Sequence, residues 1–351
     1  MTATKVLFCS GWLPVADHIS AHVRDAAVVR CGRERVPREI ADAEVVIPTG
    51  MPITAALMDA APKLKLIQQA GVGLEGVDIA AATARGIMVA NVPSTVSQSA
   101  ASVAELALML MLVLARRYGE AVAELKARHW GLPMGGTLYG KTVGIVGVGG
   151  VGRALARQLG GLDVRLLGIK RTPGEELRQR LGFAWLGDPG QLDYLLGECD
   201  FVVLCASLDE STRGLIGRAQ LARMKRSAFL VNVGRGALVD PEALEEALKE
   251  GRIAGAGLDV FGEEPVDPAS RLLRYNVAAT PHVGSVTDAA FDGVGRAVAE
   301  NVRRLLAGEP VLNCVNTAAL EQFSGSSSEQ APINCSGAGP VPSPPQWRGL
   351  G

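Results

Sequence analysis

The sequence predicts an α/β protein built around two doubly wound parallel sheets. Three observations indicate this fold class. Short apolar segments alternate with helical patterns almost from end to end of the chain. The later segments are near-continuous apolar runs, as expected for strands that helices cover on both faces. The 351 residues leave room for two domains, at roughly 150 residues per domain.

The N-terminal part of the chain predicts one small α/β unit. Its strands are expected near Val6–Cys9, Ala27–Arg30, Ala43–Ile47, Leu64–Ala70 and Ile87–Asn91. A long helix follows at roughly Ser97–Arg117, and it is apolar on nearly every face. We therefore expect this helix to be buried between the two units.

A second series of strands and helices begins near Lys141. Six strands are expected near Thr142–Val146, Val164–Ile169, Phe201–Ala206, Ala228–Val233, Ala254–Val260 and Asn276–Thr280. Helices are expected at Arg153–Leu159, Gln191–Glu198, Arg218–Met224, Pro241–Glu250 and about Asp288–Ala307. The chain then becomes rich in Ser, Gly and Pro, so we expect residues 317–351 to be a disordered tail.

Composition and charge argue against several classes of protein. The 35 Lys and Arg balance 36 Asp and Glu, which does not favour a nucleic-acid partner or a polybasic membrane surface. The longest apolar run, Leu106–Ala115, is about half of the ~20 residues that a membrane-spanning helix needs. The N-terminus does not resemble a signal peptide, and the six cysteines lack metal-ligand spacing. We expect a cytoplasmic protein with reduced thiols, no metal and no membrane partner.

A glycine-rich turn stands between a predicted strand and a predicted helix, with the sequence Gly147-Val148-Gly149-Gly150-Val151-Gly152. This order predicts a Rossmann dinucleotide-binding domain. The first glycine makes the tight turn, the second lets the backbone approach a pyrophosphate, and the last permits close packing. The loop leads into the helix, whose N-terminus attracts the pyrophosphate, and Gly150 and Val151 are expected to contact the cofactor as well. The alternative is a glycine-rich turn that binds no ligand.

The residues after the next strand bear on the choice of cofactor. An NAD enzyme of this fold has an acid there, about 20 residues beyond the glycines, that accepts the ribose hydroxyls. This chain has Lys170 and Arg171 instead, and its next carboxylate is Glu175. Two cations favour NADP(H), because they can form charge-assisted hydrogen bonds with its 2′-phosphate. The alternative is a solvated turn in a protein that also uses NAD(H).

Three polar residues follow late strands, namely Arg235, Glu264 and His282. The carboxyl ends of parallel strands form one edge of the sheet, where ligands bind. His282 suits proton exchange with an alcohol or carbonyl oxygen during hydride transfer. Glu264 could hold the imidazole and favour imidazolium, and Arg235 could bind a carboxylate and polarise a carbonyl. Each residue also has a purely structural interpretation. His282 could cap a loop, Glu264 could be a solvated acid beside Glu263, and Arg235 could be a surface cation.

Further positions at the same strand ends complete the predicted site. Asp259 is better placed to touch the nicotinamide than to move a proton. We expect cofactor contacts from Ala206, Val233, Gly234, Asp259 and Gly284, and substrate contacts from Ser285 beside Arg235 and His282.

These residues lie in motifs that resemble the D-isomer-specific 2-hydroxyacid dehydrogenases, which include glyoxylate/hydroxypyruvate reductases and phosphoglycerate dehydrogenases. The resemblance covers about Lys5 to Asn316. Besides the glycine loop, it rests on the segments Gly71–Asp78, Asn91–Pro93, Ser102–Glu105, Val231–Gly236, Gly257–Phe261 with Glu264-Pro265, and Thr280–His282.

The resemblance implies an Arg-Glu-His triad at Arg235, Glu264 and His282, and a substrate carboxylate held by the backbone amides of Val72 and Gly73. It implies a flavodoxin-like substrate domain of residues 1–97 and 286–316, hinged to a Rossmann domain of residues 98–285. It also implies a homodimer joined through the cofactor domain and its long helix. Closure of the hinge would exclude water from the hydride path.

Departures from the family pattern refine this expectation. Lys170 and Arg171 match its NADPH-using reductases, whereas Cys205-Ala206-Ser207-Leu208 replaces the commoner His-x-Pro-Leu near the adenine. Glu264 and Pro281 disfavour the formate dehydrogenase branch, and no regulatory domain is expected after Asn316. We expect a glyoxylate/hydroxypyruvate reductase-like enzyme that forms a D-2-hydroxy acid. The alternatives are a phosphoglycerate dehydrogenase-like enzyme using NAD and a dinucleotide-sensing protein similar to the family's corepressor branch.

Overall fold

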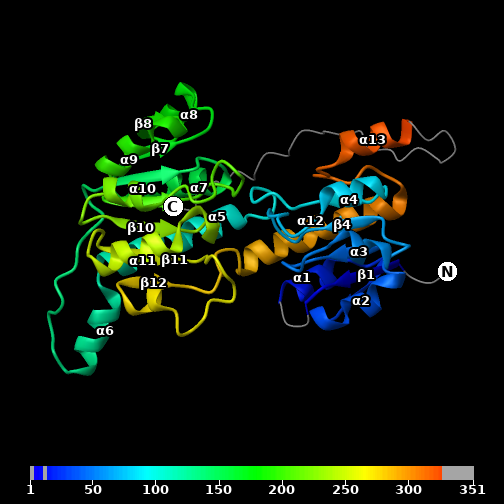
Figure 1. The fold of residues 1–351 in the computed structure, drawn as a ribbon, viewed down its shortest axis with the longest axis horizontal. Helices are drawn as coiled ribbons and strands as arrows, with labels where there is room; N and C mark the ends of the chain where they lie inside the picture. The colour runs from blue at the N-terminus through cyan, green and yellow to red at the C-terminus, as the bar shows by residue number, and fades with distance from the viewer. Residues whose placement is uncertain (1–3, 11–13, 326–351) are drawn as a thin grey trace, which may run out of the picture. The chain divides into compact units, whose positions relative to one another are not determined.

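A computed structural model describes residues 4–10 and 14–325 of the chain (Figure 1). The chain divides into two compact units, one of Met1–Val96 with the chain from Asp292 onward and one of Ser97–Phe291. The sequence predicts domain boundaries after residues 97 and 285. The two compact units divide after residues 96 and 291, which differ from these boundaries by one and six residues.

The first unit is built on a five-stranded sheet in the order β2-β1-β3-β4-β5, in which every strand pair is parallel. This order is that of flavodoxin-like folds. All five expected strands are present, as β1 (Thr4–Phe8), β2 (Ala26–Arg30), β3 (Val45–Ile47), β4 (Leu66–Gln68) and β5 (Met88–Ala90). The helices between them are α1 (Val15–His22), α2 (Val36–Glu39), α3 (Ala55–Asp59) and α4 (Ile79–Ala84).

The returning chain completes this unit with α12 (Asp288–Ala307), whose bounds match the prediction. The buried Asn301 of this helix donates from Nδ2 to Gln68 Oε1 of β4 at 2.7 Å and to Leu312 O at 3.0 Å. Because both side chains are buried, this pairing satisfies polar groups that would otherwise destabilise the core.

The second unit is built on a seven-stranded parallel sheet in the order β12-β11-β10-β9-β6-β7-β8. Counted from β6, this is the Rossmann order 3-2-1-4-5-6 with one more strand, and the predicted fold class is confirmed. The strands are β6 (Thr142–Val146), β7 (Arg165–Ile169), β8 (Phe183–Gly187), β9 (Phe201–Leu204), β10 (Phe229–Asn232), β11 (Gly255–Leu258) and β12 (Val277–Ala279). The helices are α5 (Ser99–Ala115), α6 (Tyr118–Lys126), α7 (Gly150–Leu159), α8 (Glu175–Arg180), α9 (Leu192–Glu198), α10 (Arg218–Arg223) and α11 (Pro241–Lys249).

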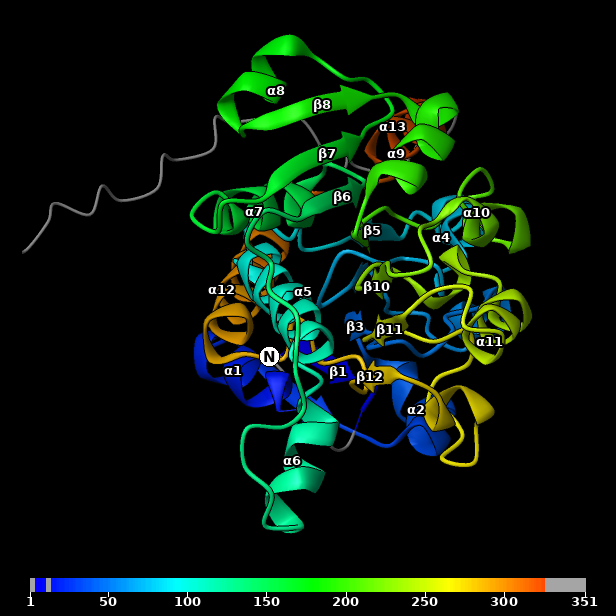
Figure 2. The ribbon, with the colours of Figure 1, turned by 90° about the vertical axis from the view of Figure 1, so that its left-hand side faces the viewer.

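Several elements differ from the expectation. Strand β8 adds a seventh strand, which was not expected although its sequence, FAWLG, is a short apolar run. It lies at the sheet edge, pairs only with β7 through a shifted register and is partly exposed. The long helix stops at Ala115, because Arg117 takes a left-handed φ of 51°, and α6 follows. Figures 1 and 2 show α6 extending away from the seven-stranded sheet.

The expectation of disorder from residue 317 is wrong for its first part, where α13 (Thr317–Gly325) forms. The buried Asn316 anchors this helix, since its side chain accepts from Val89 N at 2.9 Å and donates to Ile87 O at 2.9 Å. Leu320 of α13 is buried as well. The Ser-, Gly- and Pro-rich composition of the chain from residue 317 onward did not predict this burial. Residues 326–351 lie outside the described part of the chain.

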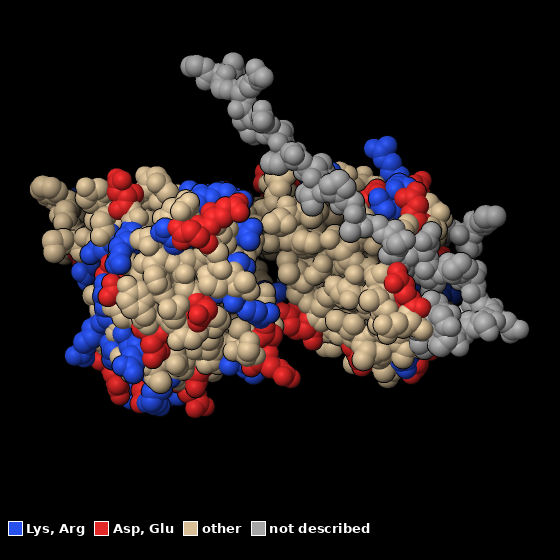
Figure 3. Space-filling model, turned by 90° about the horizontal axis from the view of Figure 1, so that it is seen from above, with Lys and Arg blue, Asp and Glu red and all other residues tan. Residues whose placement is uncertain are grey.

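The face seen in Figure 3 has no extended region of one charge sign, because acidic and basic side chains are interspersed on it. In the described residues, no single helix is long and apolar enough to cross a membrane; α5 and α6 pass that test only as a pair bent by 54°.

Candidate active site

The three predicted catalytic residues follow neighbouring strands of the second unit. Arg235 follows β10, Glu264 lies in the loop after β11, and His282 follows β12. These strands are adjacent and parallel in the sheet. Their carboxyl ends therefore bring the residues to one edge, where an open α/β sheet binds its ligand.

His282 and Glu264 form a direct pair. His282 Nδ1 lies 2.7 Å from Glu264 Oε2, and Glu264 Oε1 accepts a hydrogen bond from Phe261 N at 2.9 Å. Both side chains are partly exposed, with 44% and 36% of their surfaces accessible. This pairing orients the imidazole and leaves Nε2 as the ring nitrogen that can exchange a proton with a substrate.

The pair shifts the titration of both groups. The hydrogen bond that His282 donates to Glu264 raises the pKa of His282, and it outweighs burial, which acts in the opposite direction. Burial favours the neutral form of Glu264, yet the hydrogen bonds from His282 and Phe261 outweigh it and lower the pKa of Glu264. The acid is thus held as a carboxylate and the imidazole favours its charged form.

Arg235 is held by its own backbone turn. The buried Asn232 donates from Nδ2 to Arg235 O at 2.9 Å and accepts from Gly234 N at 3.1 Å. Arg235 Nη1 donates to Gly234 O at 2.8 Å. The charge of Arg235 also contributes to lowering the pKa of Glu264 and opposes the rise in the pKa of His282, so the three groups share one electrostatic environment.

Asp259 anchors the loop that carries His282. Its side chain is buried and accepts three hydrogen bonds, from Thr280 Oγ1 at 2.7 Å, Val283 N at 2.8 Å and Gly284 N at 2.9 Å. A Cβ on Gly284 would lie 2.9 Å from the same carboxylate. Asp259 is therefore a positioning residue for His282, and its predicted contact with nicotinamide stays a prediction. The sequence did not predict that Asn232 and Thr280 hold the site in place. The pattern that could have indicated this role is a polar residue at the end of an apolar strand.

The glycine loop has the geometry that a dinucleotide needs. Gly147 has a φ of +98°, and a Cβ there would lie 2.5 Å from Ala206 N. A Cβ on Gly152 would lie 2.3 Å from Gly147 O, whereas one on Gly149 would meet nothing within 4 Å. Helix α7 starts at Gly150 without a side-chain cap. Its N-terminal amides, those of Gly150, Val151 and Gly152, fit a pyrophosphate that approaches over the open Gly149.

The remaining predicted cofactor residues lie around this loop. Lys170 and Arg171 follow β7, and Arg171 Nη2 pairs with Asp209 Oδ2 at 2.8 Å. The buried Val233 donates to Leu204 O at 3.2 Å, in the strand that leads to Ala206. Ser285, three residues beyond His282, makes no hydrogen bond within the described part of the chain, so its substrate contact stays a prediction.

The predicted carboxylate-binding turn lies in the first unit and has an unusual distribution of hydrogen bonds. The carbonyl oxygens of Gly71, Val72 and Gly73 accept from Val92 N, Asn91 Nδ2 and Gln69 Nε2, at 2.9, 2.9 and 2.8 Å. Within the described residues, the amides of Val72 and Gly73 have no hydrogen-bond acceptor. A turn whose carbonyls are satisfied and whose N–H groups remain available suits an anion.

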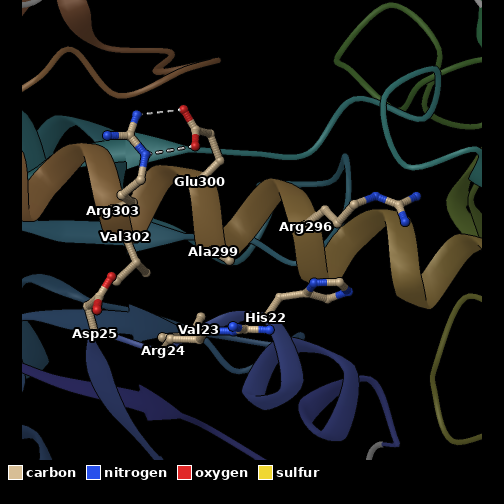
Figure 4. A pocket seen from close by; sticks show the side chains of 9 residues that line it. All are labelled: His22, Val23, Arg24, Asp25, Arg296, Ala299, Glu300, Val302 and Arg303. Atoms are coloured by element: carbon tan, nitrogen blue, oxygen red, sulfur yellow. Dashed lines mark hydrogen bonds and ion pairs between the residues drawn. The ribbon is translucent and has the colours of Figure 1, made fainter.

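The first unit also contains a pocket of about 250 Å³ between the end of α1 and α12 (Figure 4). Its cations are largely balanced by acids, since Arg303 pairs with Glu300 at 3.0 Å and with Glu309 at 2.9 Å. None of the predicted site residues line it. We assign it no role in catalysis.

A glycine loop on a Rossmann sheet, beside a histidine paired with an acid, defines the class of enzymes that transfer hydride with a nicotinamide dinucleotide. Comparisons with known proteins identify the family. Residues 108–284 match the family described as D-isomer specific 2-hydroxyacid dehydrogenase, NAD binding domain. The chain belongs to this family, and the NAD(P)-dependent enzyme class predicted from its sequence is confirmed.

Individual relatives agree with this assignment. The chain is 41% identical over 272 residues to the glyoxylate reductase of Korarchaeum cryptofilum, and the aligned segment covers 76% of this chain and 80% of that protein. It is 39% identical over 287 residues to the D-3-phosphoglycerate dehydrogenase of Methanocaldococcus jannaschii, covering 81% of this chain but only 54% of that protein. The solved NADPH-dependent glyoxylate/hydroxypyruvate reductase of Sinorhizobium meliloti, in complex with NADP and malonate, has a TM-score of 0.78 and 30% identity, covering 91% and 98% of the two chains.

Proposed function

We propose that this protein reduces a small 2-keto acid of the glyoxylate or hydroxypyruvate class to a D-2-hydroxy acid with NADPH. The observation that carries the proposal is the 2.7 Å pair of His282 and Glu264, one strand from Arg235 and on the same sheet as the glycine loop. Such a pair supplies the proton that must accompany hydride addition to a carbonyl.

Each group has a distinct task in this reaction. Bound NADPH supplies the hydride that adds to C2 of the keto acid. His282 gives the proton on Nε2 to the carbonyl oxygen, and Glu264 stabilises the imidazolium before that transfer. Arg235 binds the keto acid and polarises its carbonyl. The amides of Val72 and Gly73 bind the substrate carboxylate, a role supported by their lack of acceptors among the described residues.

A substrate panel with both cofactors tests the proposal. We expect kcat/KM to be highest for glyoxylate or hydroxypyruvate and about tenfold or more higher with NADPH than with NADH, because a 2′-phosphate bound by Lys170 and Arg171 gains charge-assisted hydrogen bonds. A clear preference for NADH would contradict the cofactor assignment. The absence of turnover on every 2-keto acid, with dinucleotide binding intact, would favour the sensor alternative.

A second candidate function is the oxidation of a phosphorylated 2-hydroxy acid, as in phosphoglycerate dehydrogenases. Arg33 favours it, because its Nη2 lies 3.5 Å from Thr49 O at the carboxyl end of β3. Residues 49–52 follow this strand, and we expect them to line the pocket for the 2-substituent of the substrate. A phosphate there would find a cation. Higher kcat/KM for 3-phosphohydroxypyruvate than for hydroxypyruvate, reduced by Arg33→Ala, would establish this alternative.

The His282–Glu264 pair predicts a pH dependence. Reduction needs imidazolium, so kcat/KM for the keto acid should be high below the pKa of His282 and fall as the pH rises through it. Because the hydrogen bond to Glu264 raises the pKa of His282, Glu264→Gln should move this falling limb to lower pH. The matched control is Glu263→Gln, which should leave the limb in place. An unmoved limb in Glu264→Gln would show that the acid does not tune the histidine.

We propose that the protein is a homodimer and that an arm of residues 117–139 lies in the interface. The arm supports this because helix α6 has no buried residue, and Trp130 and Met134 are 94% and 86% exposed. Aromatic residues and methionine are enriched where proteins associate. The cytoplasmic location expected from the sequence stays a prediction.

Light scattering after gel filtration tests the arm. We expect the wild-type protein to have twice the mass of one chain, and Trp130→Glu with Met134→Glu to shift it toward a single chain, since burying two carboxylates in an apolar interface is costly. Leu306→Glu, on an exposed position of α12, serves as the control and should leave the mass unchanged. A wild-type protein that elutes as a single chain at micromolar concentration would contradict the proposal.

A further inference from the structure

The ion pair between Arg171 and Asp209 lies where the cofactor's adenosine end is expected. We propose that Asp209 is a specificity-determining residue, which limits the preference for NADPH by occupying the guanidinium that would bind the 2′-phosphate. This inference rests on the proposed role of Arg171 in NADPH binding, and it concerns a residue that neither the glycine loop nor the catalytic triad includes.

The strand order places the pair on both sides of the glycine loop. Arg171 follows β7 and Asp209 follows β9, and β6, which leads into the loop, lies between these strands in the sheet. Gly147 N, in the loop, donates to Ile169 O at 2.9 Å on one flank, and Cys205 N on the other flank donates to Val146 O, at the end of β6, at 2.8 Å. The 2.8 Å pair of Arg171 Nη2 and Asp209 Oδ2 thus joins the two segments that flank the dinucleotide loop.

The two partners differ in how firmly they are held. Asp209 Oδ1 accepts from Ser211 N at 2.9 Å, and the hydrogen bond from the Ser211 hydroxyl is the main cause that lowers the pKa of Asp209. The Asp209 carboxylate is therefore fixed and charged. The Arg171 side chain is 78% exposed, against 41% for Asp209. Arg171 is the partner that can move, and Asp209 remains beside it as a fixed negative charge.

This asymmetry affects the two cofactors differently. A 2′-phosphate carries about −1.5 to −2 charges near pH 7, so NADPH must take Arg171 from Asp209 and bind near a carboxylate. NADH has no phosphate and leaves the ion pair intact. Lys170 has no ion pair within the described residues, so it remains available to the phosphate. The expected result is a protein that prefers NADPH less strongly than its two cations alone would allow.

Calorimetric titration with NADPH and with NADH, in the absence of a keto acid, tests the proposal. For Asp209→Asn we expect the Kd for NADPH to fall about three- to tenfold, the range for relieving one exposed charge contact with a doubly charged group. The Kd for NADH should change less than twofold. Glu210→Gln, which alters the neighbouring exposed acid, is the matched control and should change neither value.

A double-mutant cycle shows whether Asp209 acts through Arg171. In the Arg171→Ala background, Asp209→Asn should tighten NADPH binding by a smaller factor, because no guanidinium is left to compete for. Two results would overturn the proposal. One is a ratio of the NADH Kd to the NADPH Kd that stays the same or falls in Asp209→Asn. The other is an Asp209→Asn substitution that tightens NADPH binding by the same factor in the wild-type protein and in the Arg171→Ala background. A wild-type protein that prefers NADH would instead contradict the proposed NADPH preference. Even then, a higher ratio of the NADH Kd to the NADPH Kd in Asp209→Asn would support the role of Asp209.

Discussion

Replacing His282 with alanine is expected to lower kcat for keto-acid reduction about a thousandfold, within the range that a positioned general acid contributes. Nε2 is the ring nitrogen left for the substrate, because Nδ1 is engaged by Glu264 at 2.7 Å. Without imidazole, water must supply the proton. Cofactor binding should survive, because the glycine loop does not depend on this side chain. Stopped-flow turnover and calorimetric titration of NADPH on the same sample measure the two effects.

The chain offers a matched control for this variant. His22 Nε2 lies 2.8 Å from Asp292 Oδ1, so the first unit contains another histidine paired with an acid. His22→Ala should leave kcat within about twofold, since a partly exposed pair of this kind contributes little. If His282→Ala turned over at the wild-type rate, the proton would have to come from another group and the proposed mechanism would be wrong.

The sheets were predictable because their strands carry their own signal. Parallel strands covered on both faces are apolar runs, and all five strands of the first unit and six of the second appear where such runs occur. Strand β8, at the sheet edge, was not predicted although its sequence, FAWLG, is also an apolar run. Helix α13 escaped because its order depends on Asn316 reaching the backbone of Val89 and Ile87, residues distant in sequence. Long-range anchoring of this kind leaves no local pattern.

The candidate site was predictable for a related reason. Residues that end adjacent parallel strands must meet at one edge, so Arg235, Glu264 and His282 could be grouped from their positions alone. Which atoms they present to one another could not be derived. The same limit hid the role of Asp259, whose carboxylate turns toward Thr280, Val283 and Gly284. It also hid Asp209, since a loop acid has no periodicity that links it to Arg171.

Asp259→Asn is expected to have the second large effect, on stability and on catalysis together. The carboxylate accepts three hydrogen bonds with its two oxygens, and the side chain is only 2% exposed. An amide has one oxygen, so whichever way it turns, its NH₂ group faces at least one N–H or O–H donor. A buried hydrogen bond to a charged group contributes about 1.5–3 kcal/mol, so we expect the free energy of unfolding to fall by about 2–4 kcal/mol.

The loss of this anchor should also displace His282, because Val283 and Gly284 follow it directly and His282 N itself donates to Asp259 O at 2.8 Å. A displacement of about 1 Å can cost about a hundredfold in rate, so kcat should fall by about that factor in protein that is still folded. Urea denaturation and kcat measured well below the midpoint separate the two effects. Asp267→Asn is the control, because that exposed acid also accepts a backbone N–H, from Ala269 at 2.8 Å, and should cost less than about 0.5 kcal/mol. Equal stability and equal kcat for Asp259→Asn and the wild type would mean that the His282 loop is held by its backbone alone.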